Sequence, residues 1–327
     1  MRIGKISENV LKRSVLKIIE NKKSNNVSAA VTADCAYFAN EDSYVTSSVN
    51  TFTEDCEDAA YFAMHSAANN LYLSGARPVM ASLGIVLGID HDESVLKHIM
   101  KNARLAADEL GITIAGGHTE VSDTVTKPVI TVCVTGSSSR EPQKAEAKSG
   151  DYIIMTKYAG IIGSSILAKE CREKLSERLP MHLIEKASGF SNMVSVKKDY
   201  EIGSMSGARC FHDVSGGGIF AALWEMSVIT SKGLDVDIKK IPLKQETIEI
   251  TNNLMINPYQ LLSGGSLLML TDDPKKVLEA YKNAGIPASV IGRITDNNDK
   301  IIRNEDEIRF LDKPQMDEIH KLGNLPA

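Results

Sequence analysis

The chain has 327 residues, 43% hydrophobic and 24% charged, a composition typical of globular proteins and a length that suffices for two domains. A net charge of −5 and an aromatic content of 5% argue against a basic or base-stacking surface, so no nucleic-acid partner is expected. Five scattered cysteines, no signal peptide and no apolar run of about 20 residues favour a cytoplasmic protein with reduced thiols and no membrane segment.

Helices and short strands alternate in the first half of the chain. Apolar residues recur at helical spacing in Ser7–Glu20, Asp55–Leu73 and Glu93–Leu110. Glycines follow the second and third of these helices, as they often do at helix ends. Short apolar runs predict strands over Ser28–Phe38, Tyr44–Phe52, Met80–Leu87, Ile112–Ala115 and Pro128–Val134. This order indicates an α/β or α+β domain over residues 1–140.

A polar stretch, Ser137–Asp151, contains a proline and predicts a linker to a second domain over residues 151–327. Glycines there fall between predicted strands and predicted helices. The strands are Tyr152–Thr156, Leu267–Leu270 and Ala288–Ile294, and the helices cover 160–171, Gly218–Ile229 and Pro274–Ala284. The second half is therefore also expected to have α/β character.

The segment Gly116–Val121 follows the predicted strand Ile112–Ala115. Twin glycines there permit a sharp turn and a close approach to a ligand, and His118, Thr119 and Glu120 offer three different polar groups. A glycine turn with a capping threonine explains the same residues without any ligand. Both interpretations stand at this point.

Three glycine-rich segments in the second half suggest sites for an anion. Gly216, Gly217 and Gly218 follow His212-Asp213 and precede a predicted helix, so their N–H groups suit a phosphate; the alternative is a flexible loop. Lys157 before Gly160 and Gly163 could neutralise a phosphate, or these glycines could serve tight strand–helix packing. Ser263–Ser266 is a third such turn, with weaker indications of ligand contact.

Other polar groups invite simpler explanations. Asp58, His65 and Asn69 share one helical face, which indicates an interface or a satisfied polar stripe more than a ligand site. Cys210 and His212 lie on one face of a strand and resemble a thiol–imidazole pair, although nucleophilic catalysis there is not the favoured interpretation. Cys35 beside Asp34 could be reactive, but a small buried residue is the safer interpretation.

The chain resembles the aminoimidazole ribonucleotide (AIR) synthase superfamily over essentially its whole length. That superfamily includes thiamine-monophosphate kinase, selenophosphate synthetase and hydrogenase-maturation enzymes, and the likeness is greatest to AIR-synthase-related, hydrogenase maturation factor-like proteins. The residues that carry the resemblance are Ile3–Lys5, Val10–Val15, Asp34–Ala36, Gly117–Val121, Thr156-Lys157, His212–Val214 and Asn257–Gln260.

The resemblance implies a two-domain AIR-synthase-like fold that forms a homodimer through the N-terminal sheets and binds ATP with Mg2+. It implies ATP-dependent activation of an oxygen of a small-molecule or carrier-protein substrate. The cofactor-binding positions would be Asp34, Asn50, Asn70, Gly117, His118, Thr119, Glu120, Lys157, Asp213, Gly216, Gly217 and Gly218. Magnesium would be held by Asp34, Asn50, Asn70 and Glu120.

This chain departs from the family pattern at its acidic positions. Asn50 and Asn70 stand where the family has aspartates, and each change removes a negative charge from a hard-cation site. Several relatives have an acidic residue at the position of His118, and relatives often have a charged residue at the position of Gly216. The sequence ends in Leu322–Ala327 without the cysteine that carries substrate in the nitrile-forming enzyme, so that reaction is not expected.

Two functions remain after the sequence is read. The glycine turns favour an ATP-utilising enzyme with an unidentified substrate. The two asparagines favour a member that binds a nucleotide, a metabolite or a partner protein without turnover.

Overall fold

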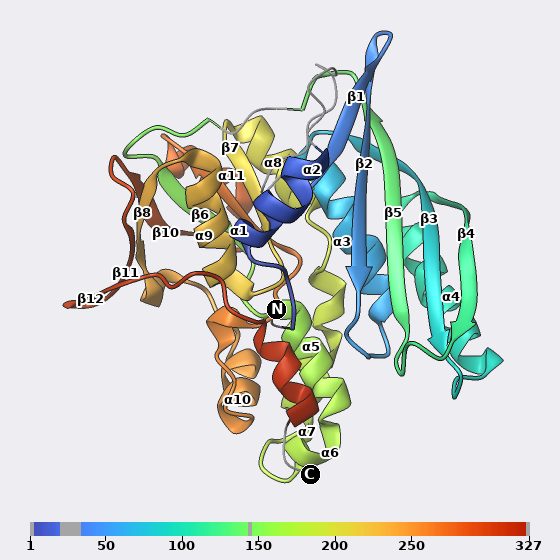
Figure 1. The fold of residues 1–327 in the computed structure, drawn as a ribbon. Coiled ribbons are helices and arrows are strands. Elements are labelled where there is room, and N and C mark those ends of the chain that lie inside the picture. Colours follow the sequence, from blue (N-terminus) through green and yellow to red (C-terminus); the bar gives the residue numbers. More distant parts are fainter. Residues whose placement is uncertain (1–2, 20–33, 143–145, 325–327) are drawn as a thin grey trace. The chain divides into compact units, whose positions relative to one another are not determined.

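The computed structural model describes residues 3–19, 34–142 and 146–324. They form two compact units, one of residues 8–143 and one of residues 144–327 together with 1–7 (Figure 1). We call these the N-terminal and C-terminal units. The chain passes between them inside the predicted linker, but the short segment before residue 8 packs with the C-terminal unit and not with the domain expected over 1–140.

The N-terminal unit is built on a five-stranded sheet in the order β1-β2-β5-β3-β4. The β3–β4 pair is parallel and the others are antiparallel. The strands are β1 (Ala36–Asn40), β2 (Ser43–Phe52), β3 (Arg77–Gly88), β4 (Thr113–Ser122) and β5 (Val129–Ser138). Two helices pack on one face of it, α3 (Ala59–Leu73) and α4 (Glu93–Leu110).

Strand alternation decides which side chains face these helices. Phe52, Ile130 and Leu83 are buried on the helix-covered face, whereas Val49 on the other face is 63% exposed. We call the second face the open face. Its central side chains are short and polar, with Thr51 and Thr131 joined by a 3.0 Å hydrogen bond.

Helix α4 begins and ends where its sequence directs, whereas α3 begins at Ala59, four residues after the expected start at Asp55. Asp92 caps α4 by accepting from the N–H groups of Ser94 and Val95, and Gly111 ends it in the left-handed conformation. The first predicted helix is continuous over 8–19 but divided into α1 (Glu8–Leu11), a π turn (Lys12–Leu16) and α2 (Lys17–Ile19). The strand predicted from Ser28 begins outside the described residues, and only β1 is seen.

The C-terminal unit contains a seven-stranded sheet in the order β12-β11-β8-β10-β6-β9-β7, antiparallel except for the β8–β11 pair. The strands are β6 (Tyr152–Thr156), β7 (Arg209–Val214), β8 (Gly233–Asp237), β9 (Ser266–Thr271), β10 (Ala288–Thr295), β11 (Lys300–Asn304) and β12 (Glu307–Phe310). Strand β9, which lies between β6 and β7, is buried at every position, and this explains its apolar run Leu267–Leu270.

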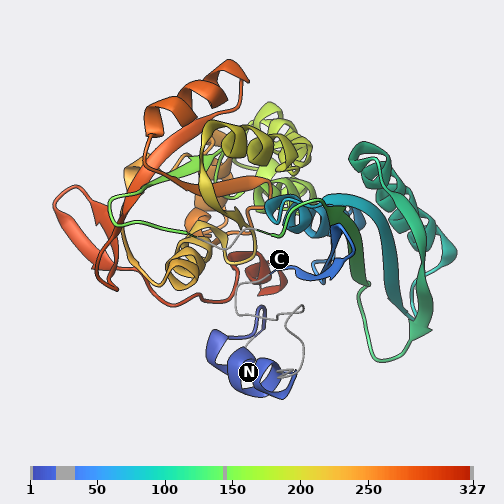
Figure 2. The same cartoon turned by 90° about the horizontal axis from the view of Figure 1, so that it is seen from above.

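Helices cover both faces of this sheet. Figure 2 shows α9 (gold) and α11 (orange) on opposite sides of it. The helices are α5 (Ile161–Glu170), α6 (Arg172–Ser176), α7 (Met181–Ser188), α8 (Lys197–Ser206), α9 (Gly218–Thr230), α10 (Gln245–Asn253) and α11 (Pro274–Asn283). Short 3-10 turns occupy Gly189–Met193, Ile238–Lys240, Pro258–Gln260 and Glu318–Asn324. Ile219, Leu223 and Met226 of α9 join the strands in one apolar core.

No helix among the described residues is both long and apolar enough to cross a bilayer.

Candidate functional site

The twin-glycine motif lies inside a strand and not at a turn. Gly116 to Val121 belong to β4, so the predicted turn after Ala115 is wrong. A side chain at Gly117 would place its Cβ 1.9 Å from the carbonyl oxygen of Leu83 on β3, whereas one at Gly116 would meet nothing within 4 Å. Gly117 is therefore needed for close approach of two strands, and its small size needs no ligand to explain it.

The polar groups after the glycines do not converge. His118 and Glu120 pair with Gly84 and Val86 of β3 and so lie on the open face, where Nε2 of His118 is 3.1 Å from Oε2 of Glu120. Their side chains are 76% and 52% exposed. Thr119 lies on the opposite face because side chains alternate along a strand. The motif therefore presents a His–Glu pair on one side of the sheet and a lone threonine on the other.

Three predicted ligand positions gather around a residue that the sequence analysis did not single out, Ser48 of β2. The Ser48 hydroxyl is 2% exposed, donates to the carbonyl of Asp34 at 2.8 Å and accepts from the side-chain amide of Asn70 at 2.9 Å. Asn50 is two residues along β2 on the same face. The β2 alternation was the signal that could have identified Ser48.

The fourth predicted magnesium ligand lies elsewhere. Glu120 is on β4, three strand spacings or roughly 14 Å from β2, and on the opposite face of the sheet from Asn50. Within the described part of the N-terminal unit, no three His, Cys, Asp or Glu side chains lie close enough to share a metal ion. The four residues thus do not fit a magnesium site within this unit, and Asp34 is the one carboxylate of the group around Ser48.

The three glycine-rich turns of the C-terminal unit meet one another through their backbones. At the start of α5, the N–H groups of Ile162 and Gly163 donate to the carbonyls of Ser263 and Leu262 at 2.8 Å each. The N–H of Ser263 in turn donates to Ser215 at 3.3 Å. Tight packing, the alternative interpretation of Gly160 and Gly163, is therefore present at the start of α5 and extends to the other two turns.

The glycines permit this close packing. A Cβ at Gly163 would lie 2.4 Å from Leu261, one at Gly264 2.1 Å from Ile162, and one at Gly218 2.6 Å from the carbonyl of Tyr259. Larger residues at these positions would separate the turns.

Lys157 is a largely buried cation, 11% exposed, with internal acceptors around its ammonium group, and its contact with a phosphate stays a prediction. Its Nζ donates to the carbonyls of Met193, Ser195 and Gly265 at 3.2, 2.7 and 2.8 Å. It also forms a 2.8 Å ion pair with Asp199, whose side chain is 1% exposed. The ammonium group can make three hydrogen bonds and already has four internal acceptors.

The amide of Gly217, predicted to receive an anion, already binds one from the same chain. It donates to Oδ2 of Asp317 at 2.5 Å, and Oδ1 of Asp317 accepts from the N–H groups of Leu262 and Ile319 at 3.0 and 2.9 Å. Burial raises the pKa of Asp317 to about 6, although the three backbone donors act in the opposite direction. The glycine turn therefore has an anion-binding geometry that an internal carboxylate fills.

Another carboxylate, that of Glu225 on α9, binds two cationic or polar partners in the same unit. Asp213 is buried at the end of β7, and the neighbouring His212 has Nε2 3.0 Å from Oε2 of Glu225 on α9. The other oxygen of Glu225 accepts from Nζ of Lys5 at 2.8 Å. Burial alone raises the pKa of Glu225, but the bonds from His212 and Lys5 prevail and lower it to about 2. Lys5 thus ties the N-terminal segment to the C-terminal unit.

The proposed thiol–imidazole pair is not supported. Cys210 has a φ of +52° at an irregularity in the β7–β9 pairing, between Arg209 and His212. Burial raises the pKa of its thiol to about 12, so the thiolate needed for nucleophilic attack is scarce. The local distortion instead changes the pairing register just before His212 and Asp213.

His65 and Asn69 of the polar stripe on α3 are buried within the unit. The His65 ring is tilted against that of Tyr61, with centroids 4.5 Å apart, and its Nε2 lies 3.3 Å from Glu109. Burial lowers the pKa of His65 to about 4, and the smaller effect of Glu109 raises it. The imidazole is therefore neutral at pH 7.

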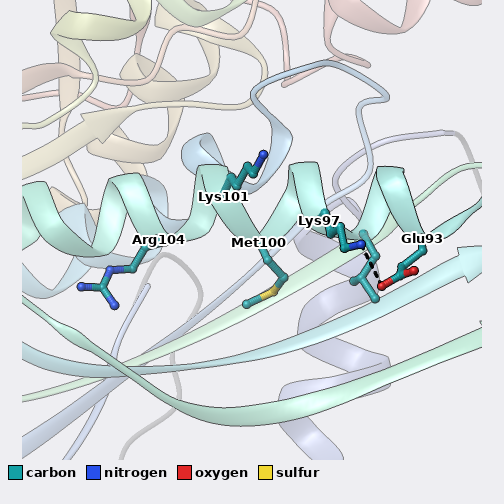
Figure 3. Close-up of a pocket in the computed structure, with 6 residues that line it drawn as sticks. Glu93, Lys97, Met100, Lys101 and Arg104 are labelled. Carbon is teal, nitrogen blue, oxygen red and sulfur yellow. Dashed lines mark ion pairs between the residues drawn. The ribbon is translucent and has the colours of Figure 1, made fainter.

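A shallow hollow of the N-terminal unit lies away from these residues. It runs along α4 and is lined by Glu93, Leu96, Lys97, Met100, Lys101 and Arg104 (Figure 3). Lys97 is engaged with Glu93 at 3.0 Å. A neighbouring apolar hollow also contacts Met100 and includes Gly116 and Gly117, so it lies between α4 and β4. No residue around Ser48 lines either hollow.

Comparisons with known proteins agree over the whole chain. The model described as AIR synthase related protein, N-terminal domain, matches residues 25–138, and the corresponding C-terminal domain model matches residues 148–304. A selenide, water dikinase of Clostridium botulinum (strain Eklund 17B / Type B) is 27% identical over an alignment of 337 positions, which covers 91% of this chain and 94% of the relative. A putative hydrogenase expression/formation protein of Methanocaldococcus jannaschii is 25% identical, with coverage of 91% and 90%.

Solved structures share this fold. The HypE–HypF complex contains a chain that matches with a TM-score of 0.76 at 21% identity, covering 93% of this chain and 99% of that one. AaThiL complexed with AMPPCP and TMP matches with a TM-score of 0.72 at 18% identity, covering 92% and 95%. HypE in complex with ATP matches with a TM-score of 0.67 at 18% identity, covering 97% of both chains.

Proposed function

Because this chain belongs to the AIR synthase-related family, we propose that it is an ATP-utilising protein of the hydrogenase maturation factor-like type. It would bind ATP and transfer the γ-phosphoryl group to an oxygen of a small molecule or of a carrier protein, with release of ADP. The observation that carries the proposal is the match of both family domains along one chain. The nucleotide complexes of the HypE and AaThiL structures, which share its fold, add support.

The group around Ser48 is the proposed nucleotide-facing part of the N-terminal unit. The backbone carbonyl of Asp34 and the side-chain amide of Asn70 both bond to Ser48, with Asn50 on the same face of β2. Carboxylate and amide oxygens are ligands of the kind that a nucleotide-bound Mg2+ takes. Since Asp34 contributes the one carboxylate, we expect ATP binding to depend less on magnesium than in a site with three aspartates. Glu120 and His118 would act on this ligand only if a second chain brought them to it.

A homodimer through the N-terminal sheets is part of this proposal. Val49 is exposed on the open face, among short side chains that leave it flat enough to meet a second sheet. The HypE–HypF complex makes a partner protein a further possibility for this chain, with the client unidentified.

A test uses the two asparagines. Calorimetric titration with ATP, with and without Mg2+, would be made on the wild type and on the double variant Asn50→Asp/Asn70→Asp. We expect the wild type to bind ATP and the double variant to gain about tenfold in magnesium-dependent affinity, because two charges are restored to a hard-cation site. The exposed Asn40→Asp is the matched control for added charge and should behave as the wild type.

The second candidate is a binding protein without turnover. The observations in its favour are the two asparagines and the internal carboxylate at Gly217. ATP binding without release of ADP in the presence of magnesium, in both the wild type and the double variant, would support it. Absence of ATP binding in every variant would overturn the nucleotide proposal as a whole.

A further inference from the structure

The last part of the chain crosses the C-terminal unit as an extended segment. Residues 311–317 have no helix or strand, and we call them the C-terminal strap. Leu311 anchors one end in the apolar core at 6% exposure, and Ile319, just beyond the other end, is 2% exposed. Residues 312–315 between these anchors are exposed. The strap is therefore anchored in the packed chain at both ends.

The second anchor is made by two acidic side chains. Asp317 and Glu318 are each 7% exposed. Asp317 accepts from Gly217 in the turn before α9 and from Leu262 in the turn before β9. Glu318 accepts from the N–H of Asn257 at 3.0 Å and from Lys321 at 2.5 Å. The strap thus holds two separate loops through carboxylates that bond to backbone amides.

The space beside the bound amide is open. A Cβ at Gly216 would meet nothing within 4 Å, whereas one at Gly217 would meet Ala221 at 2.7 Å and Gln315 of the strap at 4.0 Å. Gly217 has a φ of +80°, a left-handed conformation that favours glycine, and its N–H donates to Asp317. An oxyanion would find the same donor that Asp317 now uses, if the strap moved.

Two opposing effects act on the charge of the Asp317 carboxylate. Burial of the Asp317 carboxylate disfavours its charged form, while three N–H groups favour it. A phosphate group carries more charge and more acceptor oxygens than a carboxylate, so it can compete for the same amides.

We propose that the C-terminal strap is an autoinhibitory latch, in which Asp317 occupies the amide of Gly217 as an internal anion that a phosphate-bearing ligand must displace. Displacement would release Leu262 together with Gly217, because one carboxylate binds both amides. The latch rests on the proposed ATP-binding function only for the identity of its natural ligand. The competition itself needs only an oxyanion.

The test combines amide hydrogen exchange with binding of inorganic tripolyphosphate. In Asp317→Ala we expect the amides of Gly217 and Leu262 to exchange faster, and affinity for tripolyphosphate to rise about tenfold, within the range usual for coupled sites. The matched control is Asp312→Asn, which removes an exposed charge from the same strap and should change neither quantity. Wild-type protein with saturating tripolyphosphate should show faster exchange at Ile319, which reports strap release without any substitution.

The outcomes separate the latch from the proposed function. Equal tripolyphosphate affinity in the wild type and Asp317→Ala, or unchanged exchange at Ile319 in the loaded wild type, overturns the latch. If Asp317→Ala does not fold, the wild-type exchange measurement decides alone. Gain of tripolyphosphate affinity with no ATP binding in any variant would support the latch and reject the nucleotide proposal. ATP binding that is equal in the wild type and Asp317→Ala would support the nucleotide proposal and reject the latch.

Discussion

The two units place their polar groups in opposite ways. Around Ser48 in the N-terminal unit, one hydroxyl joins the backbone carbonyl of Asp34 to the side-chain amide of Asn70, and Asp34 is exposed. Around Gly217 in the C-terminal unit, the backbone donors are already bound to internal acceptors. The difference teaches that a glycine-rich turn before a helix can serve packing as fully as it serves a ligand. Substitutions in each unit can break or sharpen this comparison.

The largest effect is expected from Lys157 in the C-terminal unit. Lys157→Met should lower the free energy of unfolding by about 4 kcal/mol, because it leaves the buried carboxylate of Asp199 without its cation. Denaturant unfolding measures this value. The exposed Lys198→Met is the control and should change little. A small loss of unfolding free energy in Lys157→Met would contradict a structural role of the ion pair and leave Lys157 available for ligand binding.

Adjacent glycines in β4 should behave differently. Gly117→Ala should cost about 3 kcal/mol, since its methyl group would strike the Leu83 carbonyl and force the strands apart. Gly116→Ala meets open space and should cost less than about 1 kcal/mol. Thermal unfolding of the two variants gives the comparison directly. Equal losses would contradict the close-approach explanation of the motif.

The buried imidazole of α3 predicts a pH dependence of stability. Because the pKa of His65 is lowered to about 4 in the folded state, its stability contribution is complete above pH 6.5 and is lost as the pH falls toward 4. The loss should reach about 3 kcal/mol. His65→Phe should remove this part of the slope in denaturant unfolding between pH 6.5 and 4. The exposed His182→Phe should retain it, and a wild-type slope in His65→Phe would refute the assignment.

The smallest effect on folding is expected on the open face. Val49→Asp should leave the unfolding free energy of the chain within about 0.5 kcal/mol, because Val49 is exposed. It should nevertheless halve the mass seen by light scattering if two sheets meet there, since it places charge in an apolar contact. Glu54→Lys, at a partly exposed position beyond the end of β2, is the control. A wild type that already has the mass of one chain would end the dimer proposal.

Sequence patterns predicted the local elements well where neighbours decide them. The helix Glu93–Leu110 was predicted with its observed ends because Gly111 terminates it and its apolar residues recur at helical spacing. The strand Tyr152–Thr156 was equally evident. The pattern failed at Gly116-Gly117, where glycines typical of a turn lie inside a strand. The reason is a contact with Leu83, which is distant in sequence.

The candidate site was predicted only in pieces. The resemblance to relatives indicated Asp34, Asn50 and Asn70, and the structure places them around Ser48. It could not separate them from Glu120, because the face and strand order of a sheet depend on pairing between distant segments. The internal partners of Lys157 were not predicted either, because they come from segments that are distant in sequence.

The sequence by itself determined the family, the alternation of helices and strands, and the positions of the glycine turns, because these depend on residue types and their near neighbours. Only the tertiary structure decided what each turn binds. Gly217 and Asp317 are 100 residues apart, and no local pattern links an amide in one loop to a carboxylate in another. The packed chain alone brings the two groups together and buries the Asp317 carboxylate, which strengthens the hydrogen bond between them.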